Sequence, residues 1–248
     1  MAPVVTWLGQ AGFRFEAAGR RILVDPFFSK HEGRRYPPPP VEGDVDWVLI
    51  THEHLDHFDP ASLRAVAERS DALTVVAPAP LEAMVREAVP DAALVGVARG
   101  DRVPLGEAGS ASVVPAVHAL HPRDGYTDDP RFVGYVLDLD GVALYHAGDT
   151  LVTDAVVAAL ERLSVDVALL PVNGRTYFRE QADLAGNLDA RDAVALAVRI
   201  GASVLVPIHW DLFDGNTEHP GRAADEAAET DAPVHVFTLR RGLPWRAG

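Results

Sequence analysis

Cysteine is absent from this chain of 248 residues, so disulfides, thiolate metal ligands and a cysteine nucleophile are all excluded. No apolar run approaches the length that is needed to span a bilayer, and no membrane association is expected. The N-terminus, Met1 to Trp7, has no basic segment followed by an apolar core, so no signal peptide is expected. These features favour a cytoplasmic protein, although the lack of cysteine is also compatible with export.

Basic residues are scarce as well, because 22 Lys and Arg stand against 36 Asp and Glu and give a formal charge of −14. This balance argues against a broad, sequence-independent grip on nucleic acid, which needs many phosphate-facing basic side chains. It leaves room for a small anionic substrate, since bound dications and a few arginines can supply local positive potential. A homo-oligomer is compatible with the sequence, which does not determine the oligomeric state.

The order of patterns along the chain predicts one α/β (α+β) domain over residues 1–248. Apolar runs between turn residues predict strands early in the chain, and strands and helices alternate later. Asp140-Gly141 predicts a hairpin turn between two of the strands. Such an order suits two mixed sheets packed together and flanked by helices. Strands are predicted over 4–8, 12–16, 21–25, 47–50, 73–77, 94–97, 112–117, 132–139, 142–146, 165–170, 203–208 and 234–239, and helices over 60–69, 80–88, 154–163, 190–200 and 221–229.

The segment that follows the apolar run 47–50 carries four metal-binding side chains within six residues: His52, His54, Asp56 and His57. Neutral imidazole and carboxylate are the usual ligands of zinc and of harder divalent ions such as manganese. A solvated polar loop without a ligand is the alternative. The dense spacing at the end of a strand favours a metal site.

Three further residues of the same chemistry end other predicted strands, and these are His118, Asp149 and His209. Loops at one edge of an α/β sheet are the usual place for chemistry. Each of the three alone could be a structural residue held by hydrogen bonds. Together with the histidine-rich segment they suggest a set of ligands for two ions.

The series His52-x-His54-x-Asp56-His57, His118, Gly148-Asp149 and His209 resembles the ligand series of the metallo-β-lactamase superfamily, in the same order. The resemblance runs across nearly the whole chain and implies an αββα sandwich. It also implies that His52, His54 and His118 hold one ion, that Asp56, His57 and His209 hold the other, and that Asp149 bridges them.

Residues 6–13, 25–27 and 207–211 are similar to the branch that contains L-ascorbate-6-phosphate lactonase, a manganese-dependent enzyme. The chain departs from those lactonases because it lacks their N-terminal extension. Its segment from Asn173 to Phe178 is closer to uncharacterised members of the branch. The ligand chemistry suits Zn²⁺ and the narrower likeness suits Mn²⁺, so both are retained.

Two divalent ions about 3.5–4 Å apart would lower the pKa of a shared water and make hydroxide available at neutral pH. Asp149 would fix the separation of the ions and Asp56 would orient the hydroxide, which makes these two aspartates the expected catalytic residues. No protein nucleophile is needed, in agreement with the lack of cysteine and of a Gly-x-Ser-x-Gly elbow.

Substrate contacts are expected from the segment after the strand 165–170 and from the loop after His118. Arginine suits carboxylate or phosphate because it can pair with them through two hydrogen bonds. A bracing role, with Arg175 paired to an internal acidic residue, is the alternative, and for His121 a solvated loop position. The candidate substrate contacts are Asn173, Arg175, Tyr177, Arg179 and His121.

The sequence thus predicts a binuclear metal-dependent hydrolase that acts on a small anionic substrate, with a lactone or other cyclic ester as first choice. A phosphodiesterase of the same fold, acting on a cyclic nucleotide, a phospholipid-like ester or an RNA end, is the second hypothesis. The third is a metal-holding regulatory protein without turnover, and retention of all seven expected ligands argues against it.

Overall fold

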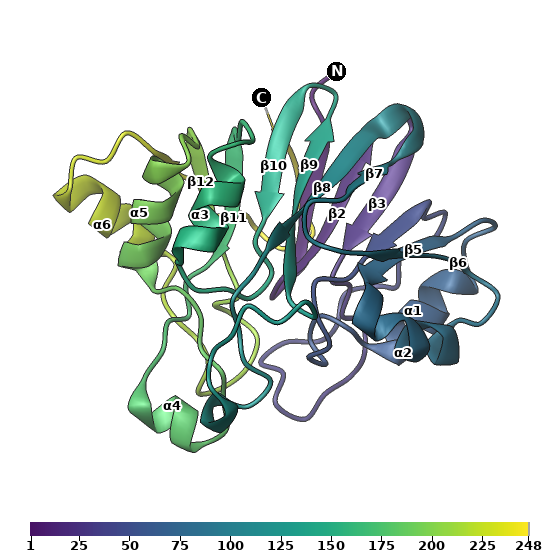
Figure 1. Ribbon diagram of the computed structural model, residues 1–248, viewed down its shortest axis with the longest axis horizontal. Helices are drawn as coiled ribbons and strands as arrows, with labels where there is room; N and C mark the ends of the chain where they lie inside the picture. The colour runs from purple at the N-terminus through teal and green to yellow at the C-terminus, as the bar shows by residue number, and fades with distance from the viewer. Residues whose placement is uncertain (248) are drawn as a thin grey trace.

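The computed structural model describes residues 1–247 as two β-sheets packed face to face, with helices on the outer side of each sheet (Figure 1). Both chain ends lie at one end of this sandwich, and the short helix α4 (Tyr177–Gln181) projects at the opposite end. The two-sheet architecture with flanking helices that the sequence predicts is therefore confirmed. None of the helices in this part of the chain is long and apolar enough to cross a membrane.

The first sheet has seven strands in the order β14-β1-β2-β3-β4-β5-β6. Strands β1 to β3 pair antiparallel, whereas β3 to β6 pair parallel. Parallel neighbours need crossover connections, which α1 (Pro60–Ala67) and α2 (Glu82–Ala88) supply while they cover the outer face. The strands are β14 (Pro244–Arg246), β1 (Val4–Gly9), β2 (Gly12–Ala17), β3 (Arg20–Val24), β4 (Trp47–Leu49), β5 (Thr74–Pro78) and β6 (Ala93–Val97).

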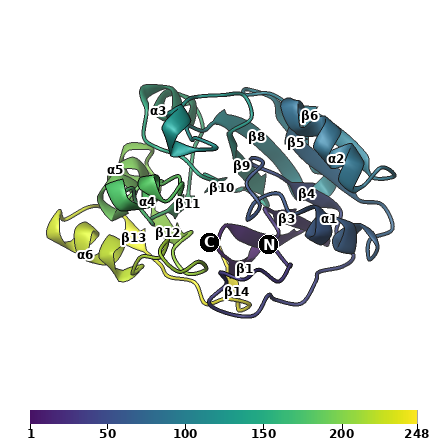
Figure 2. The same cartoon turned by 90° about the horizontal axis from the view of Figure 1, so that it is seen from below.

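The second sheet also has seven strands, in the order β13-β12-β11-β10-β9-β8-β7. Its crossover helices are α3 (Asp154–Leu160), α5 (Ala190–Arg199) and α6 (Gly221–Glu229), and Figure 2 shows α5 and α6 on the flank opposite α1 and α2. Short 3-10 turns occur at η1 (Ala79–Leu81), η2 (Gly106–Ala108) and η3 (Pro122–Asp124). The strands are β7 (Arg102–Pro104), β8 (Gly109–Pro115), β9 (Val133–Leu139), β10 (Val142–His146), β11 (Val167–Pro171), β12 (Val204–Ile208) and β13 (His235–Val236).

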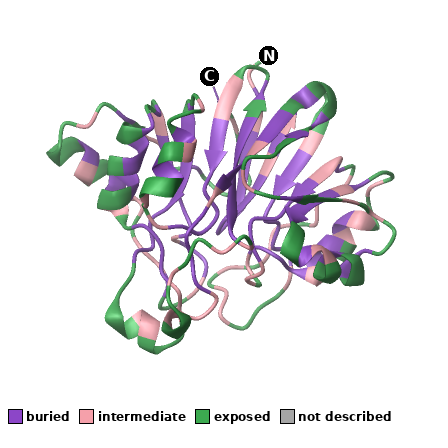
Figure 3. Ribbon diagram, viewed as in Figure 1, coloured by how far each residue is buried: buried purple, intermediate pink, exposed green. Residues whose placement is uncertain are grey.

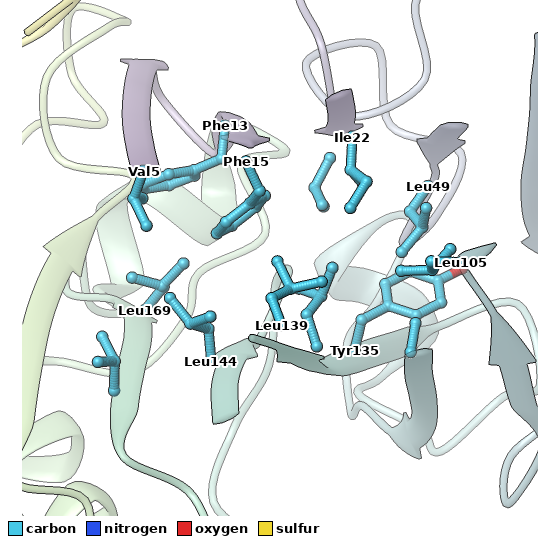
Figure 4. Packing of buried hydrophobic residues seen from close by; sticks show 14 of the residues in the cluster. Val5, Phe13, Phe15, Ile22, Leu49, Leu105, Tyr135, Leu139, Leu144 and Leu169 are labelled. Atoms are coloured by element: carbon cyan, nitrogen blue, oxygen red, sulfur yellow. The ribbon is translucent and has the colours of Figure 1, made fainter. Parts of the chain in front are cut away.

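The main core lies between the sheets and follows from the two-residue period of the strands. In β2, Phe13 and Phe15 are completely buried while Arg14 and Glu16 are only partly covered. Each buried phenylalanine contributes about 1.5–3 kcal/mol through removal of its ring from water. Most of the strand residues are buried, whereas helix α4 is exposed (Figure 3). Figure 4 shows Val5, Phe13, Phe15, Ile22 and Leu49 of the first sheet facing Leu105, Tyr135, Leu139, Leu144 and Leu169.

Most predicted elements occur within a few residues of their expected bounds, and the Asp140-Gly141 hairpin is present with positive φ at both residues. The strand predicted over 234–239 is limited to the two residues of β13. Strands β7 and β14 and helix α4 are not evident in the sequence. Both strands are three-residue edge strands that contain a proline, which weakens the local pattern.

Candidate metal centre

The segment after β4 folds into a tight turn that gathers the side chains of His52, His54, Asp56 and His57. The backbone N–H groups of His57 and Phe58 both donate to the carbonyl of His54, at 2.9 and 2.7 Å. Phe58 is buried, and the next residue, Asp59, caps the N-terminus of α1. The turn is therefore fixed at one end by β4 and at the other by a capped helix.

The other three donor residues arrive from strands of the second sheet. His118 follows β8, and its backbone forms an isolated bridge with Thr127. Asp149 follows β10 directly after Gly148, which has a φ of 59°. His209 follows β12 with a φ of 60°, and its N–H donates to the carbonyl of Gln10 at 3.1 Å. The two sheets thus bring their site residues to one edge of the sandwich.

The structure arranges the seven donor residues in two groups, within each of which the ligand atoms lie within 4.8 Å of one another. In the first group, Nδ1 of His54 lies 3.0 Å from Nε2 of His52 and 3.3 Å from Nε2 of His118. Nε2 of His118 is 3.4 Å from Oδ2 of Asp149, which completes this group.

The second group consists of Asp56, His57 and His209. Oδ2 of Asp56 lies 3.2 Å from Nε2 of His209 and 3.7 Å from Nε2 of His57. Oδ1 of Asp149 is 3.3 Å from the same nitrogen of each histidine. The two oxygens of Asp149 therefore face different groups.

Two orphaned polar atoms show that these residues fit a cation. Nε2 of His57 and Oδ1 of Asp149 are buried and have no hydrogen-bond partner in the described part of the chain, although they lie only 3.3 Å apart. A buried polar atom without a partner destabilises the folded state by about 1–3 kcal/mol. A divalent ion bound between lone pairs of nitrogen and oxygen would satisfy both atoms.

Hydrogen bonds behind the histidines fix which ring nitrogen faces the site. Nε2 of His54 donates to the carbonyl of Leu120 at 3.1 Å, so its lone pair is on Nδ1. Nδ1 of His57 donates to Oδ2 of Asp25 at 2.7 Å, which leaves Nε2 as the acceptor. Thr51 donates its hydroxyl to the same oxygen at 2.7 Å and can accept from Nδ1 of His52 at 3.0 Å. Such bonds orient ligands and raise their basicity.

The charges of the two groups shift the histidine pKa values in opposite directions. Burial and the neighbouring imidazoles hold the pKa of His52 well below its usual range, and burial chiefly lowers the pKa of His118 to about 3. Burial also lowers the pKa of His57 and His209, but adjacent carboxylates, led by Asp149, raise it by more. Without metal, the rings of His52 and His118 are therefore held neutral, whereas those of His57 and His209 hold protons that a cation must displace.

Comparison with known proteins identifies the family. Residues 20–210 match the β-lactamase superfamily domain. This chain belongs to the metallo-β-lactamase superfamily. It is similar to the UPF0173 metal-dependent hydrolases of Thermococcus kodakarensis (33% identical, covering 87% of this chain and 88% of that protein) and Methanopyrus kandleri (31% identical, 96% and 97%). Igni18, a metallo hydrolase of Ignicoccus hospitalis, has the same fold with a TM-score of 0.76, 21% identity and coverage of 100% of both chains.

The superfamily assignment that the ligand motif suggested is thus confirmed, and this superfamily member is a metal-dependent hydrolase. A cavity of about 300 Å³ opens beside its donor groups. That volume is at the small end of the range for ligand sites. His31 and Phe213 pack edge to face on one wall, with ring centroids 5.3 Å apart. The full lining is His31, His54, Leu55, Asp56, Leu120, His121, Asp149, Asp183, Leu184, Ala185, His209, Phe213 and Asn216.

Of the five expected substrate contacts of this hydrolase, only His121 lines the cavity. Asn173 is buried, where it donates to Asn216 at 2.9 Å and accepts from Asn187 at 3.1 Å. Tyr177 lies on α4 and is 69% exposed.

The two arginines of this segment have protein partners. Arg175 pairs with Glu180 at 3.0 Å and lies over the ring of Tyr126, 4.3 Å from its centre. The guanidinium of Arg179 donates to the carbonyls of Asn173, Gly215 and Thr217. Both arginines therefore contact the protein itself. For Arg175 this agrees with the bracing role that the sequence analysis gave as the alternative to substrate binding.

Sequence reasoning missed three residues that support the donors of this superfamily member: Asp25, Thr51 and Gln10. Asp25 is completely buried behind His57 and accepts from the N–H of Thr51 at 2.9 Å. Nε2 of Gln10 donates to Oδ2 of Asp56 at 2.8 Å. Gln10 and Asp25 stand at strand ends with positive φ, and a polar residue directly after an apolar strand was the available signal.

Proposed function

We propose that this protein hydrolyses a small lactone or other cyclic ester at a site that holds two divalent ions. The position of Asp149 carries the proposal, because its Oδ2 faces His118 in the first donor group and its Oδ1 faces His57 and His209 in the second. A carboxylate in that position can join two ions, with His52, His54 and His118 as further ligands of one and Asp56, His57 and His209 of the other.

Two ions bound there would lower the pKa of a water and polarise the carbonyl under attack. The chain's own residues supply orientation. Gln10 holds the Asp56 carboxylate in place through its amide, and Asp25 keeps the lone pair of His57 directed at the site. Within the described residues the lining has no serine, threonine, tyrosine or cysteine, so the cavity offers no hydroxyl or thiol nucleophile.

The cavity favours an uncharged substrate over the anionic one expected from the sequence. Within residues 1–247 its lining contains no arginine or lysine, and Leu55, Leu120, Leu184, Ala185 and Phe213 make its walls largely apolar. The two ions could neutralise an anionic group that lies against them, but a second anionic group farther out, such as the phosphate of a phosphorylated lactone, would need compensating positive charge at that wall. The likeness to the lactonase branch therefore supports the ester chemistry more than the phosphate group.

A parallel test uses Mn²⁺ and Zn²⁺, because imidazole suits zinc and carboxylate suits manganese. Purified protein loaded with each metal is assayed on unsubstituted lactones, phosphorylated lactones, phosphodiesters and thioesters, and its metal content is measured. We expect close to two ions per chain, with the highest kcat/KM on uncharged lactones. A single retained ion in excess metal would contradict the two-ion site, and preference for phosphodiesters would contradict the substrate class.

Asp149→Ala should reduce metal content and abolish hydrolysis, because both donor groups lose a ligand. Arg175→Gln is the matched comparison, since Arg175 lies outside the cavity lining and pairs with Glu180. We expect it to keep its metal and leave KM for an uncharged lactone unchanged. A large rise in KM would restore Arg175 as a substrate contact.

A further inference from the structure

The wall of the cavity carries an acid–base pair that the donor groups do not use. Nδ1 of His121 lies 2.8 Å from Oδ2 of Asp183, and both residues line the cavity. The two residues are 62 positions apart in the sequence, so the pair exists only in the folded chain. Neither residue belongs to the donor groups.

The chemistry of this pair is that of a proton donor. When Asp183 accepts the hydrogen bond from Nδ1–H, the second ring nitrogen, Nε2, remains available to give or take a proton. The carboxylate also holds the ring in one orientation and one tautomer. The two side chains are 45% and 48% exposed, so the imidazole can exchange protons with solvent between turnovers.

Independent contacts hold the two halves of the pair together. The segment with His121 begins at the bridge between His118 and Thr127, next to a donor residue. The hydroxyl of Tyr126 on that segment donates to Glu180 of α4 at 3.1 Å and accepts from the N–H of Gly186 at 2.9 Å. These two hydrogen bonds hold the segment 118–127 against residues 177–186, which include α4 and Asp183.

Arg175 and Arg179 hold α4 in place. Arg175 pairs with Glu180 while its guanidinium covers the ring of Tyr126. Arg179 ties α4 to the chain around residues 173 and 215–217. Asp183 itself has a φ of 60°, a left-handed conformation that aspartate tolerates better than most residues.

We infer that His121 is the catalytic acid that protonates the leaving oxygen and that Asp183 is its positioning residue. The inference rests on the proposed ester hydrolysis. The oxygen of water forms a bond to the acyl carbon, and the bond from that carbon to the ring oxygen breaks with its electron pair left on the oxygen. The leaving oxygen takes the proton from Nε2 of His121. The attacking water loses one proton, and this proton returns to the neutral ring of His121. The net change is consumption of one water.

Two lactone probes separate an acid from a merely structural residue. δ-Valerolactone releases an alkoxide, a strong base that needs a proton as it leaves, whereas dihydrocoumarin releases a phenolate, which leaves without one. General acid catalysis contributes about 10²–10⁴-fold. We expect His121→Gln to lower kcat on δ-valerolactone at least about 100-fold and on dihydrocoumarin less than about tenfold. Asp183→Asn should also lower kcat more on δ-valerolactone than on dihydrocoumarin, but by a smaller factor than His121→Gln.

Arg123→Gln is the matched control, because Arg123 follows His121 by two residues and its side chain is 73% exposed outside the cavity lining. It should match the wild type on both probes. All variants should keep the wild-type metal content and melting temperature. Asp183→Asn tests the inference if His121→Gln does not fold.

Equal losses on both probes, or loss of metal in the His121 and Asp183 variants, would overturn the acid role while leaving the proposed function standing. Failure of the metal-loaded wild type to hydrolyse either lactone would overturn the proposed function, and the acid role would fall with it. Selective loss on δ-valerolactone with unchanged metal content supports both.

Discussion

The hydrogen bond between Asp25 and His57 allows a test of how supporting residues set the metal affinity of the donor groups. Asp25 accepts three hydrogen bonds, from the N–H of Thr51 at 2.9 Å, from its hydroxyl at 2.7 Å and from Nδ1 of His57 at 2.7 Å. In Asp25→Asn, the amide oxygen can still accept from the N–H of Thr51. The new NH₂ group would face the other two partners, and both would have to accept instead of donate.

This reversal moves the proton of His57 from Nδ1 to Nε2, the atom that faces Asp56 and Asp149. The lone pair for metal is then lost while the shape of the site is kept. Loss of such a supporting bond costs about 10- to 100-fold in metal affinity, or about 1.4–2.8 kcal/mol. Because Thr51 also contacts Nδ1 of His52 at 3.0 Å, the reversal can extend to the first donor group, which favours the upper value.

Metal affinity is measured by competition with a chromophoric chelator, and the His57 tautomer is followed by ¹⁵N NMR of the metal-free protein at a pH high enough to leave its ring neutral. Asp46→Asn is the control, because Asp46 accepts from the N–H of Arg21 at 2.8 Å and takes no part in the donor groups. Wild-type affinity in Asp25→Asn, or an unchanged His57 tautomer, would refute the reasoning. Reduced affinity in the Asp46 control would show that the effect is not specific.

Three further predictions concern the surroundings of the donors. Burial lowers the pKa of His209 but the neighbouring carboxylates raise it by more, so its proton competes with metal, and chelator-measured affinity should still rise as the pH passes above 6.5, the ordinary value for histidine; a profile that is flat there would contradict this. Gly148→Ala should lower the melting temperature more than Gly141→Ala, because both have positive φ but only the Cβ at 148 meets Thr51, at 2.8 Å; equal losses would contradict a steric cause. Gln10→Ala should weaken metal binding about tenfold in the same chelator assay without lowering the melting temperature by more than a few degrees, and unchanged affinity would remove Gln10 from the site.

The donor residues could be found from the sequence because their signal is local. A strand end followed by His52, His54, Asp56 and His57 within six residues needs no knowledge of the fold. A lone histidine after an apolar run, such as His209, became a candidate only together with that segment. The parallel strands then bring such ends to one edge. Two packed sheets with outer helices were predictable as well, since the periods of apolar residues report strands and helices directly, and the resemblance of the ligand series to a known superfamily implied the αββα order.

The partners of those donors could not be read from the chain. Asp25 reaches His57 across 32 positions and His121 reaches Asp183 across 62, and nothing in the local pattern of either residue specifies the other. The two arginines could have faced a substrate or the protein.

The sequence by itself therefore determined the fold class and the metal-binding chemistry, because both follow from local spacing. Only the tertiary structure decided which atoms of the histidines face inward, that no arginine or lysine within residues 1–247 lines the cavity, and that an acid–base pair does. These features depend on how loops from two different sheets pack against each other, and that packing is set by contacts between residues far apart in the chain.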